Sequence, residues 1–148
     1  MYKHLLIATD GSALSDRAVT KGVELAAQLG ANVTFVTVSE MWSPSEMADR
    51  AKLGDGFGVE NFEAALTESS RKILAAAAGV ASKAGVASDG VHVADKRPAE
   101  GVCAVAASSG CDLLVIATHG RRGLLQLWLG SQAMEIIAMS PVPVFIIR

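Results

Sequence analysis

Short apolar runs alternate with longer segments of helical periodicity along the chain, and this order is the strongest constraint on its fold. The runs predict strands at residues 4–9, 31–38, 90–94, 113–117 and 142–147. Strands that alternate with helices form a parallel sheet with helices on both of its faces. A length of 148 residues fits one domain with a sizeable core. The sequence therefore predicts a single α/β domain.

The fourth predicted strand is followed by a pattern typical of a phosphate-binding turn. The apolar run 113–117 breaks at Gly120, and a helical pattern begins after Gly130 and Ser131. The apolar residues that recur at helical spacing are Ala133, Met134, Ile137 and Ala138. Glycine lets backbone N–H groups approach an anion, and the first N–H groups of a helix have no internal partner. The pattern predicts a phosphate cradle, although a strand-exit turn and an ordinary helix start would produce the same glycines.

The glycine spacing resembles the signature of the ATP-binding branch of the universal stress protein family. That signature is glycine, two residues, glycine, nine residues, then glycine followed by serine or threonine. Nine residues separate Gly120 from Gly130, Ser131 follows, and Ala117 stands where the signature has its first glycine. The start (HLLIATDGS) and the end (PVPVFIIR) of the chain also resemble this family. A second branch of the family lacks these glycines and does not bind ATP, so the resemblance is to the binding branch.

The resemblance implies a universal stress protein domain over residues 1–148. Its fold would be a Rossmann-like three-layer sandwich of the adenine nucleotide alpha hydrolase-like type, with a five-stranded parallel sheet in the order 3-2-1-4-5. In such a sheet the chain winds in opposite directions from the centre, and ligands bind at the carboxyl ends of the strands at that switch point. Thr9 with Asp10, and Ala117 with Thr118, would meet there.

The resemblance also implies ATP as the ligand, with a Mg²⁺ ion held mainly by the phosphates; AMP, cyclic AMP and other adenine nucleotides are open alternatives. The phosphates would bind to the backbone N–H groups of Gly120, Gly130, Ser131 and Gln132. The hydroxyl group of Ser131 adds a donor, and Arg121 could reach the phosphates from the loop.

The nucleoside would lie at the ends of three strands. The residues implied there are Ala8, Thr9, Asp10, Val38, Ile116 and Ala117. The backbone of Val38 would pair with the adenine edge, and the methyl group of Ala117 is expected to weaken binding without removing a backbone donor. Asp10 has two interpretations: it caps the turn into the first helix with Ser12, or it contacts ribose or Mg²⁺. Its location favours the contact.

Composition argues against several other functions. A net charge of −2 and an aromatic content of 5% predict no basic surface for nucleic acid. No apolar segment is long enough to span a membrane, so we expect a cytoplasmic protein without a membrane partner. Cys103 and Cys111 have no metal-ligand spacing and are expected to be buried and reduced. The short motifs of P-loops, dinucleotide-binding turns and serine-hydrolase elbows do not occur.

The sequence leaves three functions open. The favoured one is a stress-response or signalling module whose nucleotide occupancy changes its binding to a regulatory protein. A slow ATPase or self-phosphorylating enzyme is less favoured, because Asp10 is the one carboxylate expected near the phosphates. The third is a dimeric interaction protein that binds no nucleotide. The run from Val142 to Ile147 contains Pro143, which belongs on a sheet edge, and the resemblance implies a homodimer through this strand.

Overall fold

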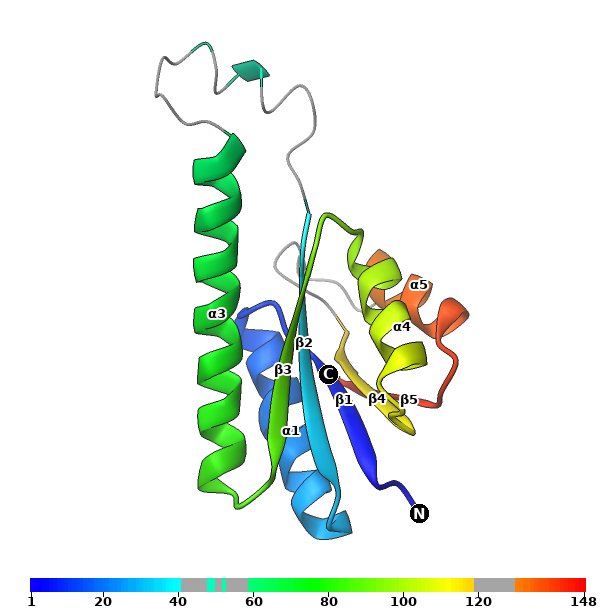
Figure 1. Ribbon diagram of the computed structural model, residues 1–148. Coiled ribbons are helices and arrows are strands. Elements are labelled where there is room, and N and C mark those ends of the chain that lie inside the picture. The colour runs from blue at the N-terminus through cyan, green and yellow to red at the C-terminus, as the bar shows by residue number, and fades with distance from the viewer. Residues whose placement is uncertain (41–47, 50–51, 53–58, 119–129) are drawn as a thin grey trace.

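Strands and helices alternate through the part of the chain that the structure describes (Figure 1). This structure is a computed structural model, and it describes residues 1–40, 48–49, 52, 59–118 and 130–148. The elements are β1 (His4–Ala8), α1 (Ala13–Leu29), β2 (Asn32–Ser39), α3 (Val59–Lys83), β3 (Ser88–Ala94), α4 (Pro98–Ser108), β4 (Leu113–Ala117), α5 (Ser131–Met139) and β5 (Val144–Ile147). The predicted α/β class is therefore confirmed.

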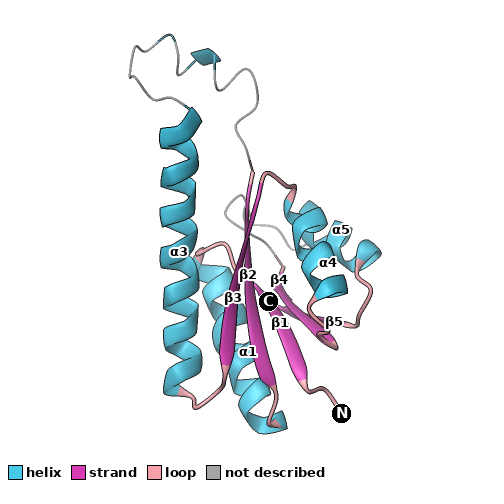
Figure 2. Cartoon of the chain, in the orientation of Figure 1, coloured by secondary structure: helices cyan, strands magenta, loops and turns pink. Residues whose placement is uncertain are grey.

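The five strands form one parallel sheet in the order β3-β2-β1-β4-β5, as the family resemblance implied. β1 lies at the centre, where Leu5 pairs with Val33 of β2 on one side and with Leu113 of β4 on the other. Because the strands are parallel, β1, β2 and β4 all end on the same side of the sheet (Figure 2). The chain winds from β1 to β3 in one direction and then crosses to β4 on the other side of β1, so the switch point lies between the ends of β1 and β4.

Two separate cores cover the two faces of the sheet. α1 and α3 pack on one face, and α4 and α5 pack on the other (Figure 1). Side chains alternate between the faces along a strand: Leu5 and Ile7 enter the first core, whereas Leu6 enters the second. All three side chains are fully buried. A strand that is covered on both faces needs a continuous apolar run, which is what β1 has.

Local sequence explains where the helices begin and end. The hydroxyl group of Ser12 accepts a hydrogen bond from the Ser15 N–H group and caps α1. Gly30 ends this helix at a φ of 63°, a left-handed conformation that favours glycine. Pro98 is the first residue of α4, where its missing N–H group costs no helical hydrogen bond.

The last strand is shorter than predicted, since it begins at Val144 rather than at Val142. The Ser140 hydroxyl group donates to the carbonyl oxygen of Val142 at 2.7 Å, and the Val142 N–H group points back at the same hydroxyl. These bonds hold Val142 in the turn after α5. Pro143 thus precedes the strand instead of lying inside it, although its carbonyl oxygen accepts from Leu114 of β4. β5 is an edge strand, as its proline predicted.

The segment after Gly130 is helical, as its apolar spacing predicted. Ala133 and Ile136 are buried, whereas Met134 and Ile137 are 53% and 38% exposed. Apolar residues therefore lie on both the buried and the exposed side of this short helix. At the other edge of the sheet, β3 begins two residues before the predicted start, at Ser88.

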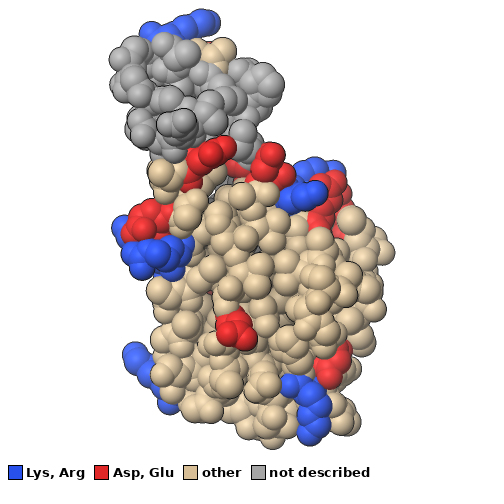
Figure 3. Space-filling view, in the orientation of Figure 1, with Lys and Arg blue, Asp and Glu red and all other residues tan. Residues whose placement is uncertain are grey.

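Figure 3 shows charged side chains of both signs near the margin of one face of the molecule, and an acidic side chain also lies near the middle of that face. None of the helices that the structure describes is both long enough and apolar enough to cross a bilayer.

Candidate functional site

The turn from β1 into α1 is held together by its own side chains. The Thr9 and Ser15 hydroxyl groups lie 3.2 Å apart, and the Asp10 N–H group donates to the Ser15 hydroxyl. Gly11 donates its N–H group to the Thr9 hydroxyl, and Ser12 donates its N–H group to Asp10 Oδ1 at 2.9 Å. The N–H groups of this turn are therefore used internally, and the turn forms a rigid floor rather than an anion cradle. The role of Ser15 in holding this turn was not predicted, because no local sequence motif indicates it.

Asp10 stabilises the turn into α1, as its capping interpretation predicted. Its side chain is half-buried, and its Oδ1 atom holds the N–H group of Ser12, the N-cap residue of α1. The alternative role, a contact to ribose or Mg²⁺, stays a prediction. Ala8 and Ala117 are half-buried at the ends of β1 and β4, whereas Ile116 is buried in the core beneath α4 and α5.

No side chain in the described segments caps the N-terminus of α5. Gly130 is the N-cap residue, and its N–H group donates to the carbonyl oxygen of Thr118 at 2.9 Å, which fixes the helix start beside the end of β4. The first helical bond runs from the Met134 N–H group to the Gly130 carbonyl, so the N–H groups of residues 131–133 precede it. The first turn contains no acidic residue. Among the described residues these N–H donors have no partner, and the helix start adds the positive end of a helix dipole.

A buried acceptor lies in the same first turn. The Oε1 atom of Gln132 is buried and has no hydrogen-bond partner within the described part of the chain. Gly120 and Arg121, which were predicted to complete the cradle, lie outside the described residues.

The main chain of Val38 faces the other side of the switch point. The bond from Thr9 N–H to the Val36 carbonyl shows that even-numbered residues of β2 direct their backbone groups toward β1. The bond from Asp95 N–H to the Ser39 carbonyl shows that odd-numbered residues face β3. β1 has already ended at the level of Val38. Within the described chain, the N–H and C=O groups of Val38 therefore point into the space beyond β1 without a strand to pair with.

These elements define the site. The β1–α1 turn is its floor, the free N–H and C=O pair of Val38 bounds it on the β2 side, and the uncapped start of α5 bounds it on the β4 side. Such a site suits a ligand with a planar polar edge at one end and an anionic group at the other.

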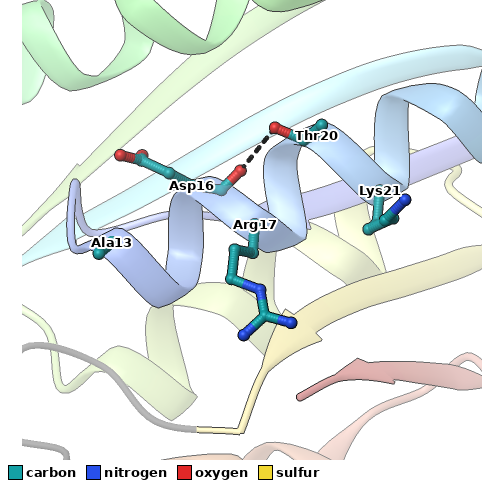
Figure 4. A pocket seen from close by; sticks show the side chains of 5 residues that line it. All are labelled: Ala13, Asp16, Arg17, Thr20 and Lys21. Carbon is teal, nitrogen blue, oxygen red and sulfur yellow. Dashed lines mark hydrogen bonds between the residues drawn. The ribbon is translucent and has the colours of Figure 1, made fainter.

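A separate hollow of about 230 Å³ lies on the outer side of α1 (Figure 4). The residues that line it are Ala13, Asp16, Arg17, Thr20 and Lys21. All five belong to one helix, and two of their polar groups are used locally: Thr20 donates to the Asp16 carbonyl, and Lys21 pairs with Glu24. A hollow between side chains of one helix is a less suitable ligand site than the end of β1.

The thiol groups of Cys103 and Cys111 are buried and free, as predicted. Burial raises the pKa of both thiols above its ordinary value. No three His, Cys, Asp or Glu residues of the described segments are grouped so that they could hold a metal ion.

The whole chain, residues 1–148, matches the family model described as the universal stress protein family. The chain belongs to this family. A universal stress protein of Thermus aquaticus is 29% identical over 148 residues, which is all of both chains. A crystal structure of a universal stress protein from Burkholderia pseudomallei is 25% identical, with a TM-score of 0.76 over 99% of this chain and 96% of that one.

Some universal stress protein structures with the same fold contain adenine nucleotides. A protein of Archaeoglobus fulgidus in complex with dAMP is 19% identical, with a TM-score of 0.70 over 99% of this chain and 98% of that one. A protein of Arabidopsis thaliana with AMP bound is 16% identical, with a TM-score of 0.64 over 98% and 90%. A third, in complex with cyclic AMP, is 23% identical, with a TM-score of 0.67 over 99% and 97%.

Proposed function

We propose that this universal stress protein binds an adenine nucleotide at the end of β1, and that ATP is its ligand. The observation that carries the proposal is the arrangement of free backbone groups around the switch point. Adenine presents a donor, its amino group, beside a ring-nitrogen acceptor. The C=O and N–H groups of Val38 are the complementary pair.

The phosphate groups would lie at the start of α5. Three N–H groups precede the first helical bond there, and no carboxylate of the first turn competes for them. The nucleotides in the similar structures support an adenine ligand in general. The preference for ATP rests on the number of donors, which suits a polyphosphate. A Mg²⁺ ion would be held mainly by the phosphates.

The test is calorimetric titration with ATP, AMP and cyclic AMP of the wild-type protein and of Gly130→Val. Gly130 has φ and ψ values of −61° and 153°, a conformation that valine adopts readily. The variant should therefore fold, but its side chain would occupy the place of the phosphates. Loss of ATP binding with an unchanged circular dichroism spectrum is expected, whereas equal affinity would refute the phosphate assignment. Mass spectrometry of ligand released from freshly purified protein would identify the nucleotide that is bound in the cell.

We further propose that two copies pair through β5, and that nucleotide occupancy changes the binding of a regulatory protein. Phe145 of this edge strand is 45% exposed, and Met134 and Met139 of the neighbouring helix α5 are about half exposed. Exposed apolar side chains at a sheet edge favour association. Residence in the cytoplasm stays a prediction from the sequence.

A further inference from the structure

The carboxyl end of β2 is held from both faces of the sheet, at the level of Val38. We propose that Gly101 of α4 and the pair formed by Ser39 and His92 are positioning residues that aim the Val38 backbone at the base of the ligand. This inference rests on the proposed nucleotide binding, and it names the residues that set its preference for adenine.

On the α4 face, Gly101 lets the helix lie directly on Val38. A Cβ atom built on Gly101 would lie 2.7 and 2.9 Å from the two Cγ atoms of Val38, closer than carbon atoms can approach. The χ1 angle of a β-branched side chain in a strand is restricted, so Val38 cannot easily turn away. Any side chain at position 101 must therefore displace either α4 or the end of β2.

Another glycine shows why this contact is unusually sensitive. A Cβ atom on Gly22 of α1 would lie 2.5 Å from Cδ1 of Ile7, which is the free end of a longer side chain. That atom can move by rotation about χ2. At Gly101 both clashing atoms are attached directly to the Cβ atom of Val38, so a clash is transmitted to the strand backbone.

On the opposite face, the Ser39 hydroxyl group lies 2.7 Å from Nε2 of His92 on β3. Ser39 is buried, and its carbonyl oxygen also accepts from the N–H group of Asp95. Asp95 has a φ of 58°, a left-handed conformation that is uncommon for residues other than glycine. The residue after Val38 is thus fixed to β3 by both its side chain and its main chain.

Because the end of β2 is held from both faces of the sheet, the N–H and C=O groups of Val38 cannot readily shift to bind a different base. Guanine presents an oxygen acceptor where adenine presents its amino donor. The C=O group of a fixed Val38 would face that oxygen without a hydrogen between them. If Val38 were displaced, its backbone would no longer form the hydrogen bond to adenine, and it would no longer repel the oxygen of guanine. The preference for adenine would then be reduced.

The experiment compares ATP and GTP, whose triphosphates are identical, by calorimetric titration of the full chain. In Gly101→Ala the ratio of ATP to GTP affinity should fall by about tenfold, the effect of one weakened hydrogen bond. In Val38→Ala/Gly101→Ala the new methyl group fills the space of the removed ones, and the ratio should recover. The control is Gly79→Ala in α3, another helical glycine, whose Cβ atom would meet nothing within 4 Å.

Each outcome decides between the two proposals. A wild-type protein that does not bind ATP, or binds GTP equally well, would refute the proposed function. If Gly101→Ala leaves the wild-type preference for ATP intact, the positioning role is overturned but the proposed function is not. The same holds if Gly101→Ala lowers the affinities for ATP and GTP equally. If Gly101→Ala does not fold, Ser39→Ala serves as the test, because it removes the hydrogen bond to His92 without introducing a clash. A reduced ratio of ATP to GTP affinity in Ser39→Ala would support the inference. An unchanged ratio would overturn it.

Discussion

Replacing Gly130 by aspartate should make the protein more stable and at the same time unable to bind nucleotide. Gly130 is the N-cap residue of α5 and has an extended backbone, the conformation in which aspartate caps a helix. The new carboxylate would accept from the N–H groups that we assign to the phosphates. It would thus supply the cap that the helix lacks and fill the anion site.

The gain in stability can be estimated from this geometry. Aspartate is better than glycine at an N-cap by a few tenths of a kcal/mol, and a charge beside the helix dipole adds about 0.3–1 kcal/mol. A total near ~1 kcal/mol corresponds to a rise in Tm of roughly 2–4 °C for a chain of this size.

The loss in affinity should be much larger than the gain in stability. A hydrogen bond to a charged group contributes about 1.5–3 kcal/mol, and the carboxylate would remove at least one such bond and repel the phosphates. A total of ~3 kcal/mol is an affinity loss of more than about 100-fold.

The assay combines thermal unfolding without nucleotide and calorimetric titration with ATP. Gly130→Asn serves as the matched control, since asparagine caps equally well without a charge. It should give only the smaller part of the rise in Tm that comes from capping, and a smaller loss of affinity. If Gly130→Asp were stabilised and still bound ATP as tightly as the wild type, the phosphates could not lie at the start of α5, and the reasoning would be refuted.

Four further predictions follow from other parts of the molecule. Phe145→Asp should convert a homodimer into a monomer by light scattering; this position is better than Val144, which packs into the second core, and a wild-type monomer at micromolar concentration would contradict the interface. Burial tends to raise the pKa of Asp112, but hydrogen bonds from the N–H groups of Lys3 and His4 (2.8 and 3.1 Å) outweigh it and lower that pKa. The stability that Asp112 contributes should therefore be complete above about pH 4 and be lost as the pH falls through the lowered pKa, so that Asp112→Asn lowers Tm at neutral pH by a few degrees and has little effect in acid. Cys103 and Cys111 should react with a thiol reagent at neutral pH only as fast as the protein unfolds, since burial raises their pKa; rapid labelling of native protein would disprove this. Single-turnover hydrolysis of ATP should be slower than about 1 per second, because Asp10 already holds the Ser12 N–H group; a faster rate that Asp10→Ala abolished would make the protein an enzyme.

Much of the fold could be predicted because its signals are local. Gly30 and Pro98 mark helix ends through their backbone preferences, and β4 matches its apolar run, 113–117, residue for residue. Edge strands were predicted less well. β3 is half exposed and has no continuous apolar run to mark its start. Val142 lies outside β5 because its carbonyl oxygen accepts a hydrogen bond from the Ser140 hydroxyl group in the preceding turn.

The candidate site was predictable only in part, for a different reason. Glycine spacing indicated the start of α5, and the family resemblance implied Thr9 and Val38 at the ends of their strands. The residues that hold them come from distant parts of the chain: Ser39 and His92 are 53 positions apart, and Gly101 meets Val38 from another helix. Such contacts leave no periodic trace in a single sequence.

The position of β1 in the sheet has a consequence for the synthesis of the protein. β1 emerges from the ribosome first, yet one of its two neighbours, β4, follows much later; the bond between Lys3 and Asp112 spans 109 positions. At ribosomal speeds this interval corresponds to roughly 5–20 seconds. During that time β1 can pair with β2, but its other edge and the side chain of Leu6, which enters the second core with α4, β4 and α5, stay uncovered. A newly made chain should therefore depend on chaperones until its second half has been translated.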